Sequence, residues 1–353
     1  MNVLIIRVSA IGDVIHTLPS ILLLKQSHPS ARISWIVQEK AASLLKNQPF
    51  IDNLWVIPNK FLRPENWTKT YSLLKEIKRI HWDAILDFQG IFKTSLLLSF
   101  LRGKKYGFSF DHARSSITAL LTHKQVSPVY TNIIQKNLAL ASFVAQDLFK
   151  IQASPTLKSL QTKDFLSISN EKKQLVDSWL TKNNLTKFLI IAPNTTWPSK
   201  HLPEEHWRDF LLKTTSHKLN LEKNISFLLV GKEFGEQALN LSRFIETEGL
   251  NVFVAPSWDL LTTAYLIKKA QLIIAPDTGL LHLADFLGTK SIGIFGPTQA
   301  LKSGPFLSEQ NKKNAIQVPC PHSQQKTHGP YSEQNCMYKL SPEQLYTKVK
   351  ENL

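Results

Sequence analysis

The segment from Leu272 to Thr298 constrains the fold more than any other stretch of this chain. Its first four residues are apolar, which is typical of a strand buried on both faces of a sheet. A polar turn, Asp277-Thr278-Gly279, then opens a run whose apolar residues recur with helical spacing, and Gly288 can end that helix. A second apolar run follows at 291–295. The segment therefore predicts strand, helix and strand in succession, the repeating unit of a parallel α/β sheet.

The same alternation runs along the rest of the chain. We expect further strands at 3–8, 32–37, 54–57, 83–88, 188–192, 225–230 and 251–254. We expect further helices at 14–26, 39–47, 66–80, 91–101, 204–219, 235–248 and 259–269. Such alternation predicts parallel sheets with right-handed crossovers, hence an α/β fold of two Rossmann-like domains that face a central cleft.

A polar stretch rich in Ser, Thr and Lys at 151–187 separates the two series of strands and helices. We therefore expect domains at 1–170 and 171–340, followed by a terminal helix at 341–353 that Ser341 and Pro342 begin. The N-terminus has no basic start and its apolar run is interrupted by a charged residue, so we expect it not to act as a signal peptide. The chain also has no apolar run long enough to span a bilayer, which predicts a cytoplasmic location.

The positive charge is concentrated in the first half of the chain. Residues 1–170 hold 21 Lys and Arg against 10 Asp and Glu, whereas the remainder holds 21 against 17. Basic surface predicts an anionic partner. The sequence has no signature of a nucleic-acid-binding module, so nucleic acid is not the expected partner, and an anionic substrate or surface is.

Ligands of parallel α/β sheets bind beyond the carboxyl ends of the strands, so the loops there are candidate sites. In the first half, Asp13 is the one ionisable residue of the turn after the first strand, where it could cap a helix, face a ligand or do both. The turn has no G-x-G-x-x-G pattern, which argues against a nicotinamide cofactor. The loops after the next strands are polar and basic, and a solvated surface is the simpler interpretation of each.

In the second half, four loops carry groups that suit a nucleotide. Thr195, Thr196 and Lys200 could neutralise a diphosphate, and Glu236 could bind ribose hydroxyls. Trp258 offers a flat surface for a base. The helix that starts after Asp277 has unpaired N–H groups at its N-terminus, which can hold a phosphate. An ordinary turn in which an aspartate caps the helix is the alternative for this last loop.

The two cysteines, Cys320 and Cys336, flank His322 and His328. Their spacing is not one that zinc sites commonly use, so we predict no metal, and a structural metal at these four residues stays the alternative.

Two motifs resemble one family. The sequence VSAIGDVIHTLP at 8–19, together with DTGLLHLA at 277–284 and FGPT at 295–298, resembles the lipopolysaccharide heptosyltransferases. The resemblance runs over nearly the whole chain and is nearest to members that add the first heptose to Kdo-lipid A. It implies a glycosyltransferase B fold, an ADP-heptose donor and no cofactor or metal. A departure lies at 195–200, TTWPSK, where Lys200 is matched but its surroundings are not.

The resemblance also implies roles for individual residues. The implied catalytic residues are Asp13, as general base, and Lys200. The implied donor-binding residues are Thr195, Thr196, Lys200, Glu236, Trp258, Asp277, Thr278, Gly279, Leu280 and His282. The implied acceptor-binding residues are Ser9, Gly12, His16, Arg63, Gln89, Lys93 and Arg114.

The implied reaction transfers heptose, with inversion, to a Kdo residue of the lipopolysaccharide inner core. The acceptor is an anionic glycolipid of the Kdo-lipid A type, so the resemblance also implies peripheral contact with the cytoplasmic face of the inner membrane. Two alternatives remain: a heptosyltransferase acting on another core sugar or on a protein, and a nucleotide-sugar binding protein without turnover.

Overall fold

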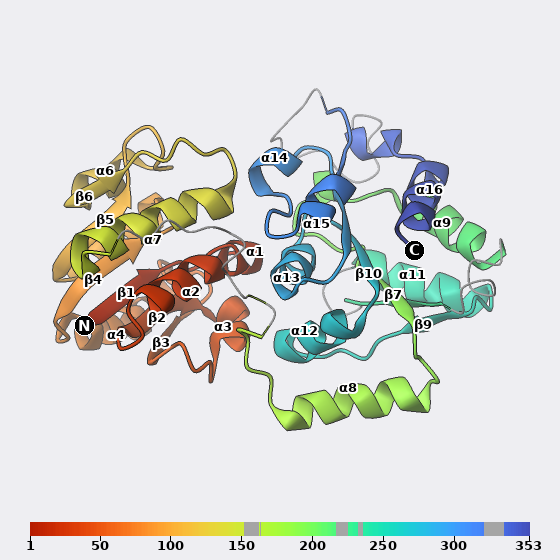
Figure 1. Ribbon diagram of the computed structural model, residues 1–353, viewed down its shortest axis with the longest axis horizontal. Coiled ribbons are helices and arrows are strands. Elements are labelled where there is room, and N and C mark those ends of the chain that lie inside the picture. The colour runs from red at the N-terminus through yellow and green to blue at the C-terminus, as the bar shows by residue number, and fades with distance from the viewer. Residues whose placement is uncertain (152–161, 163, 217–224, 232–235, 321–334) are drawn as a thin grey trace. The chain divides into compact units, whose positions relative to one another are not determined.

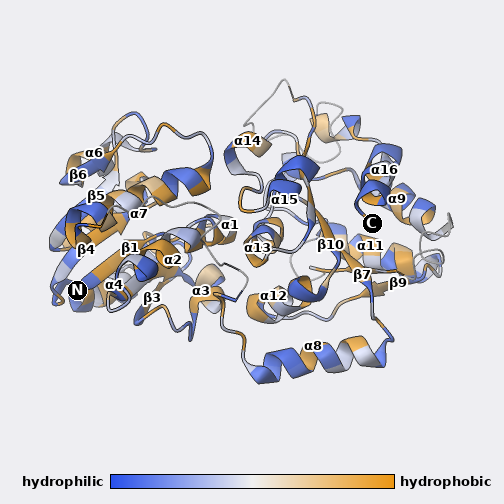
Figure 2. Cartoon of the chain, viewed as in Figure 1, coloured by the Kyte–Doolittle hydropathy of each residue, from blue (hydrophilic) through white to orange (hydrophobic). Residues whose placement is uncertain are grey.

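The computed structural model describes residues 1–151, 162, 164–216, 225–231, 236–320 and 335–353. The chain divides into two compact units, Met1–Ser167 and Ile168–Leu353 (Figure 1). Each unit is a six-stranded, wholly parallel sheet with helices on both faces, which confirms the expected fold class. Figure 2 shows strands that are mostly hydrophobic between helices that carry more hydrophilic residues. Strands covered by helices on both faces must be apolar throughout, which explains this distribution.

The sheet of the first unit reverses its strand order at its centre. Its strands, in spatial order, are β3 (Asn53–Ile57), β2 (Arg32–Gln38), β1 (Asn2–Ile6), β4 (Trp82–Asp87), β5 (Gly103–Phe108) and β6 (Lys124–Val126). The chain runs outward from β1 in one direction and outward from β4 in the other. In register, Ile6 lies opposite Asp87 at the carboxyl ends of these two strands. A ligand crevice is therefore expected beyond β1 and β4.

Right-handed crossovers distribute the helices of the first unit over two faces. One face carries α1 (Ile11–Ile15), α2 (Leu18–Ser27), α3 (Glu39–Leu45) and α7 (Ile133–Phe149), and α2 packs along α7 (Figure 1). The other face carries α4 (Pro64–Lys78), α5 (Phe92–Phe100) and α6 (Ser116–Leu121), with α5 in contact with both neighbours.

The first helix differs from its prediction. We expected one helix at 14–26, but the structure has α1 and α2 with a break at His16 and Thr17. Pro19 sits in the first turn of α2, where its missing N–H costs nothing and its fixed φ favours a new start. Asp13 therefore lies inside α1 and does not cap a helix, because the cap position belongs to Ala10.

The second unit repeats the same topology. Its strands, in spatial order, are β12 (Ile316–Gln317), β11 (Ser291–Phe295), β10 (Leu272–Pro276), β7 (Phe188–Ile191), β8 (Ser226–Leu229) and β9 (Val252–Val254). The order reverses between β7 and β10, so the loops after these two strands meet at the expected ligand edge.

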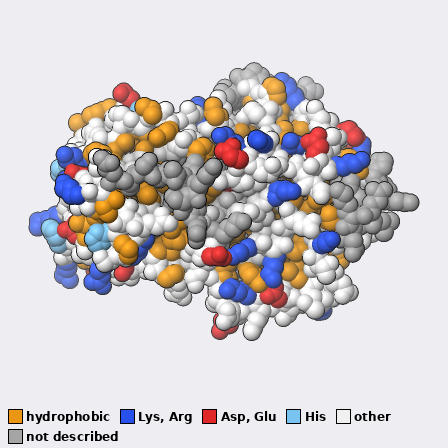
Figure 3. Space-filling view, viewed as in Figure 1, with side chains coloured by type: hydrophobic (Ala, Val, Ile, Leu, Met, Phe, Trp, Pro, Cys, Tyr) orange, Lys and Arg blue, Asp and Glu red, His pale blue; other side chains and the backbone are white. Residues whose placement is uncertain are grey.

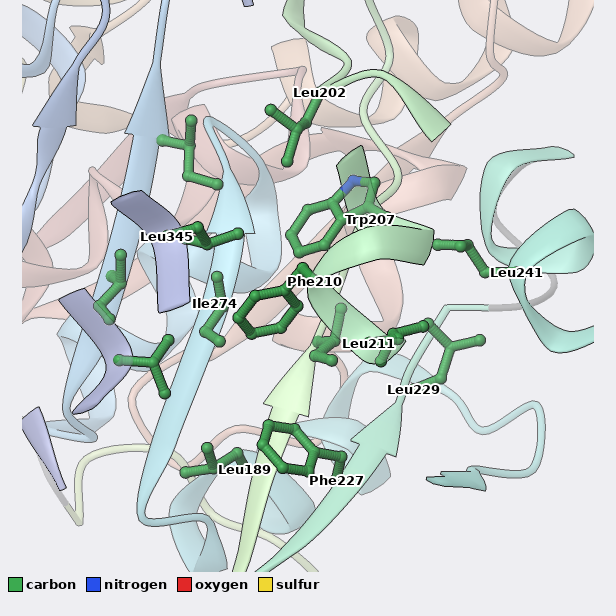
Figure 4. Packing of buried hydrophobic residues seen from close by; sticks show 14 of the residues in the cluster. Leu189, Leu202, Trp207, Phe210, Leu211, Phe227, Leu229, Leu241, Ile274 and Leu345 are labelled. Atoms are coloured by element: carbon green, nitrogen blue, oxygen red, sulfur yellow. The ribbon is translucent and has the colours of Figure 1, made fainter. Parts of the chain in front are cut away.

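Helices again cover both faces of the second sheet. One face carries α9 (Glu204–Ser216), α11 (Glu236–Thr247) and α16 (Pro342–Asn352), and the other carries α8 (Asn170–Lys182), α12 (Leu260–Lys269) and α13 (Gly279–Leu287). Short helices complete the unit: η2 (Pro198–Lys200), α14 (Ala300–Ser303), α15 (Glu309–Asn314) and η4 (Cys336–Lys339). In Figure 4, Trp207 and Phe210 of α9 pack against Ile274 of β10 and Leu345 of α16 in the core of this unit. No helix in the described ranges is both long and apolar enough to cross a membrane.

The polar stretch at 151–187 contains a helix that the sequence analysis missed. Helix α8 packs on α12 and buries only Val176 and Leu180. It is also held by ion pairs, since Lys172 pairs with Asp259 and Asp177 pairs with Lys269 at 3.2 Å, and by a ring contact of Trp179 with Trp258. A helix with so narrow an apolar stripe has no strong periodic signal, which is why its composition suggested a linker.

Candidate active site

Asp13 stands at the carboxyl edge of the first sheet, held by a buried arginine. Nη2 of Arg7 lies 2.8 Å from Oδ1 of Asp13; the arginine side chain is 1% exposed and the aspartate side chain 25%. The other terminal nitrogen of Arg7, Nη1, donates to the carbonyl of Phe88, and Trp35 Nε1 donates to the carbonyl of Arg7 at 3.1 Å. Within the part of the chain that the structure describes, no hydrogen bond or ion pair engages Oδ2 of Asp13. The arrangement holds one carboxylate oxygen and leaves the second for a ligand.

The charges around Asp13 keep it ionised. Burial by itself would raise its pKa, but the positive charges of Arg7, His16 and Arg114 outweigh burial, so the pKa lies below its ordinary value. Arg114 is exposed, whereas His16 is buried. Two of the residues assigned to the acceptor thus belong to the electrostatic environment of Asp13. Ser9 and Gly12, on the same turn, are half-buried.

The loop after β4 uses its polar groups for its own structure. Asp87 accepts from the N–H groups of Gln89 at 2.9 Å and Gly90 at 3.1 Å, and from Thr94 Oγ1 at 2.8 Å. The amide of Gln89 accepts from the N–H of Val8 at 2.8 Å and donates to Ser9 Oγ at 3.4 Å. Gln89 therefore ties the loop after β4 to the end of β1, in addition to any contact with a ligand.

Three cationic side chains surround a hollow beside this edge. The hollow has a volume of about 290 Å³ and is lined by Lys60, Phe61, Leu62, Arg63 and Lys93. Arg63 and Lys93 are exposed, and Arg63 has a loose ion pair with Glu65 at 3.7 Å. The structure thus brings together two residues that the sequence analysis assigned to the acceptor, and it adds Lys60. Cations around an open hollow suit a carboxylate or a phosphate.

In the second unit, Lys200, Asp277 and His282 form one buried cluster at the edge beyond β7 and β10. Nζ of Lys200 lies 2.7 Å from Oδ2 of Asp277, and Nε2 of His282 lies 2.9 Å from Oδ1. The ammonium also lies over the Trp197 ring, 4.5 Å from its centre. Burial alone would raise the pKa of Asp277, but His282 and Lys200 lower it far below its ordinary value.

The residue that caps the N-terminus of α13 is Thr278, not the aspartate considered in the sequence analysis. Thr278 occupies the cap position and its side chain accepts from the N–H of Leu281 at 3.5 Å, while Asp277 is used for Lys200 and His282. Gly279 and Leu280 begin α13 and are half-buried, so their N–H groups are within reach of a ligand. An anion at this end would meet the positive pole of α13 beside the Lys200 ammonium.

The other predicted donor residues lie on the neighbouring loops of the same unit. Oγ1 of Thr195 accepts from the N–H of Trp197 at 3.4 Å, and Thr196 is exposed. Glu236 begins α11 and is also exposed. Trp258 is half-buried against Trp179, with the ring centres 5.6 Å apart.

Cys320 and Cys336 are free thiols, and burial, followed by the neighbouring Cys320, raises the pKa of Cys336 to about 12. His322 and His328 lie outside the described residues. Among the residues that are described, no three His, Cys, Asp or Glu side chains are grouped so that they could hold a metal ion.

A sequence model of the family described as glycosyltransferase family 9 (heptosyltransferase) matches residues 70–332, well over half of the chain. The chain belongs to glycosyltransferase family 9. It is therefore an enzyme. This membership confirms the resemblance inferred from the motifs.

Curated relatives and solved structures extend this family 9 assignment. The chain is 29% identical to lipopolysaccharide heptosyltransferase 1 of Campylobacter coli, over 88% of each chain. It is 26% identical to lipopolysaccharide heptosyltransferase 1 of Pseudomonas aeruginosa, over 98% of this chain and 92% of the relative. The structure of the Escherichia coli heptosyltransferase WaaC with ADP matches all of both chains with a TM-score of 0.73 at 21% identity. That structural likeness shows the glycosyltransferase B fold.

Two residues of these clusters escaped the sequence analysis. Arg7 was noted only as a charge that interrupts the N-terminal apolar run, and Lys60 only as part of a basic loop. The signal for Arg7 was present, because a charged side chain at the end of a strand buried on both faces needs a partner inside the protein.

Proposed function

We propose that this family 9 enzyme transfers heptose from ADP-L-glycero-D-manno-heptose to a Kdo residue of the lipopolysaccharide inner core, with inversion. The observation that carries the proposal is the Arg7-held carboxylate of Asp13 at the edge of β1 and β4. The names of the curated relatives support the same sugar and the same glycolipid.

In the proposed mechanism, Asp13 is the general base. Its Oδ2 accepts the proton of a Kdo hydroxyl while that oxygen attacks the anomeric carbon of heptose. The bond from this carbon to the diphosphate oxygen breaks as the new glycosidic bond forms, and ADP leaves with the electron pair. A carboxylate with a low pKa is a weak base but is always ionised at neutral pH, and the hydroxyl becomes more acidic as its oxygen bonds to carbon.

On the donor side, we propose that Lys200 and the first N–H groups of α13 stabilise the charge that develops on the diphosphate. Both are fixed before the reaction, Lys200 by Asp277 and the helix end by Thr278, so little reorganisation opposes their effect. Thr195 and Thr196 would bind the diphosphate, Glu236 the ribose and Trp258 the adenine.

On the acceptor side, we propose that Arg63 and Lys93 bind an anionic group of the glycolipid in the hollow that they line with Lys60. Arg114 would face the Kdo carboxylate near Asp13. The acceptor carries lipid chains, so the enzyme would act as a peripheral protein on the cytoplasmic face of the inner membrane.

The test is ADP release from ADP-heptose, measured with and without Kdo-lipid A, for the wild type and Asp13→Asn. We expect acceptor-dependent release that falls by about 10²–10⁴-fold in the variant, while ADP binding to the donor cluster is unchanged. Asn keeps the shape of the side chain, so the loss would report on the proton acceptor.

The other outcomes separate the alternatives. Undiminished turnover by Asp13→Asn would refute the role of the base. Stabilisation by ADP without release in the presence of Kdo-lipid A would refute the proposed acceptor and direct the search to another core sugar or a protein. Binding of ADP-heptose without turnover on any acceptor would leave a nucleotide-sugar binding protein.

A further inference from the structure

Exposed large hydrophobic side chains gather on the first unit. Among the described residues, every exposed Trp, Tyr and Phe belongs to this unit, and the second unit exposes only Leu175, Leu212 and Leu301. Isolated exposed leucines are ordinary, whereas a group of exposed aromatic residues indicates a surface that binds another protein or a membrane.

Five of these exposed residues share one face of the first sheet. Trp67 and Tyr71 lie on α4, Phe92 on α5, and Ile117 and Leu120 on α6, the three helices that cover the face opposite α2 and α7. We call these five residues and their helices the α4–α6 face. The helices are contiguous, because α5 contacts both α4 and α6.

Ring contacts join the two aromatic residues of α4 to the end of α5. The rings of Trp67 and Tyr71 each meet the ring of Phe100 edge-on, with centres 6.4 Å apart. At the far end, Leu120 is 71% exposed. Beside α6, Val129 is 92% exposed on a loop that Ser127 holds to Ser109 at 2.8 Å. In Figure 3, hydrophobic side chains lie near the position of α6, with Lys and Arg side chains beside them.

Positive charge surrounds this apolar surface. Helix α4 carries exposed Lys69, Lys75 and Lys78 and ends at Arg79, against two glutamates. Segment 60–124, which contains all three helices, holds 12 Lys and Arg against 5 Asp and Glu. Two copies of such a face would repel each other, so a second copy of this chain is a poor occupant.

We propose that the α4–α6 face is the surface by which this enzyme docks on an anionic phospholipid bilayer. Trp and Tyr prefer the boundary between lipid tails and headgroups, where a ring meets apolar chains and its polar atom meets water. Lysines around such residues are attracted to anionic headgroups. Exposed rings, exposed aliphatic tips and surrounding lysines together match a membrane interface and not a water-facing surface.

The face is continuous with the cationic hollow. Phe92, 54% exposed, precedes Lys93 of the hollow, and α4 begins directly after Arg63. In this respect the inference rests on the proposed function, because a bilayer on this face would present the sugar of a membrane-embedded acceptor to the hollow while its lipid chains stay in the membrane.

The experiment is cosedimentation of the full chain with vesicles of phosphatidylglycerol and phosphatidylethanolamine. We expect the wild type to bind, and binding to weaken when salt is raised from about 0.1 M to about 0.5 M. The double variant Trp67→Ser with Leu120→Ser should lose about tenfold or more in partitioning, because two apolar side chains no longer enter the interface. Leu175→Ser, at an exposed leucine on α8, is the matched control and should bind like the wild type.

Two further readouts keep the inference separate from the proposed function. With a water-soluble Kdo acceptor that lacks long acyl chains, the double variant should turn over like the wild type, because neither residue touches the sugar sites. Vesicle binding that depends on Trp67 and Leu120 would support the docking surface even if no heptose transfer occurred. Three results would overturn the inference. The wild type could stay in the supernatant, the double variant could bind as well as the wild type, or the protein could self-associate through this face in place of binding vesicles.

Discussion

Asp13, just after β1, and Asp87, the last residue of β4, lie at the carboxyl ends of neighbouring strands, yet their surroundings give them different properties. Asp87 is fully buried and accepts from backbone N–H groups and a hydroxyl, and burial, partly offset by these bonds, raises its pKa. Asp13 keeps a quarter of its side chain exposed, and Arg7 leads the charges that lower its pKa. The carboxylate of Asp87 therefore stabilises a loop, whereas the carboxylate of Asp13 is available to a substrate.

Replacing Arg7 should change the pH dependence of turnover. Arg7 favours the ionised form of Asp13, so Arg7→Met should raise the pKa of Asp13 and move the acidic limb of kcat/KM to higher pH. Arg7→Lys keeps a positive charge and should move that limb less. The measurement is kcat/KM against pH, with ADP affinity as the check that the donor cluster is intact. An unchanged acidic limb in Arg7→Met would show that Arg7 does not act through Asp13.

Asp277 should stabilise the folded second unit, in addition to holding Lys200 at the proposed donor site. Asp277→Asn leaves the ammonium of Lys200, only 12% exposed, without its counter-charge, and should lower the free energy of unfolding by about 3 kcal/mol. Asp177→Asn is the control, since its ion pair with Lys269 is exposed and should contribute about 0–1 kcal/mol. Urea unfolding at pH 7 measures both.

The pH dependence of that stability follows from the lowered pKa of Asp277. A carboxylate whose pKa is lower in the folded state stabilises the fold above its unfolded pKa of about 4 and loses that contribution as the pH falls through the folded value. The difference in stability between wild type and Asp277→Asn should therefore shrink only below about pH 4. A difference that vanished near neutral pH would contradict this assignment.

At the scale of elements, helix α8 shows how a polar segment becomes part of a unit. Leu180, 7% exposed, packs toward α12, whereas Leu175 on the same helix faces solvent. Leu180→Ala should destabilise the protein by about 2–3 kcal/mol, through the lost burial and the cavity left behind. Leu175→Ala should change stability by less than about 0.5 kcal/mol. Equal effects of the two substitutions in urea unfolding would show that α8 is not docked in solution.

At the scale of the whole molecule, charge is divided unequally between the units. Residues 1–167 hold 21 basic and 10 acidic side chains, and residues 168–353 hold 21 and 17. The proposed acceptor is a dense anion, so kcat/KM for Kdo-lipid A should fall about tenfold or more between about 0.05 M and 0.5 M salt. The KM for ADP-heptose, bound by a nearly balanced unit, should change less. Equal salt dependence for both substrates would contradict the proposal that the first unit binds the anionic acceptor and the second unit binds the donor.

Periodicity alone predicted much of this protein. Strands covered on both faces are runs of apolar residues, and helices between them show a spacing near 3.6, so the central strands of both sheets and the edges that carry the polar loops were predictable. The outer strands β5, β6 and β12 were not predicted. The segment 272–298 folded as predicted, including Gly288 in the left-handed conformation that ends α13. Where the pattern was weak, at α8, the prediction failed because tertiary contacts and not periodicity hold the helix.

Only the tertiary structure decided which charges meet. Arg7 and Asp13 both come soon after β1, but the carbonyl of Phe88 that holds Arg7 follows β4, and Lys200 and Asp277 are 77 residues apart. These two contacts depend on strand order, because the reversal of each sheet places the loops after β1 and β4, and after β7 and β10, side by side. The same order set α4, α5 and α6 on one face. Local sequence thus predicts which side chains stand at the carboxyl ends of the strands. The arrangement of distant strands decides which partners those side chains meet, how far they are buried and how their pKa values shift.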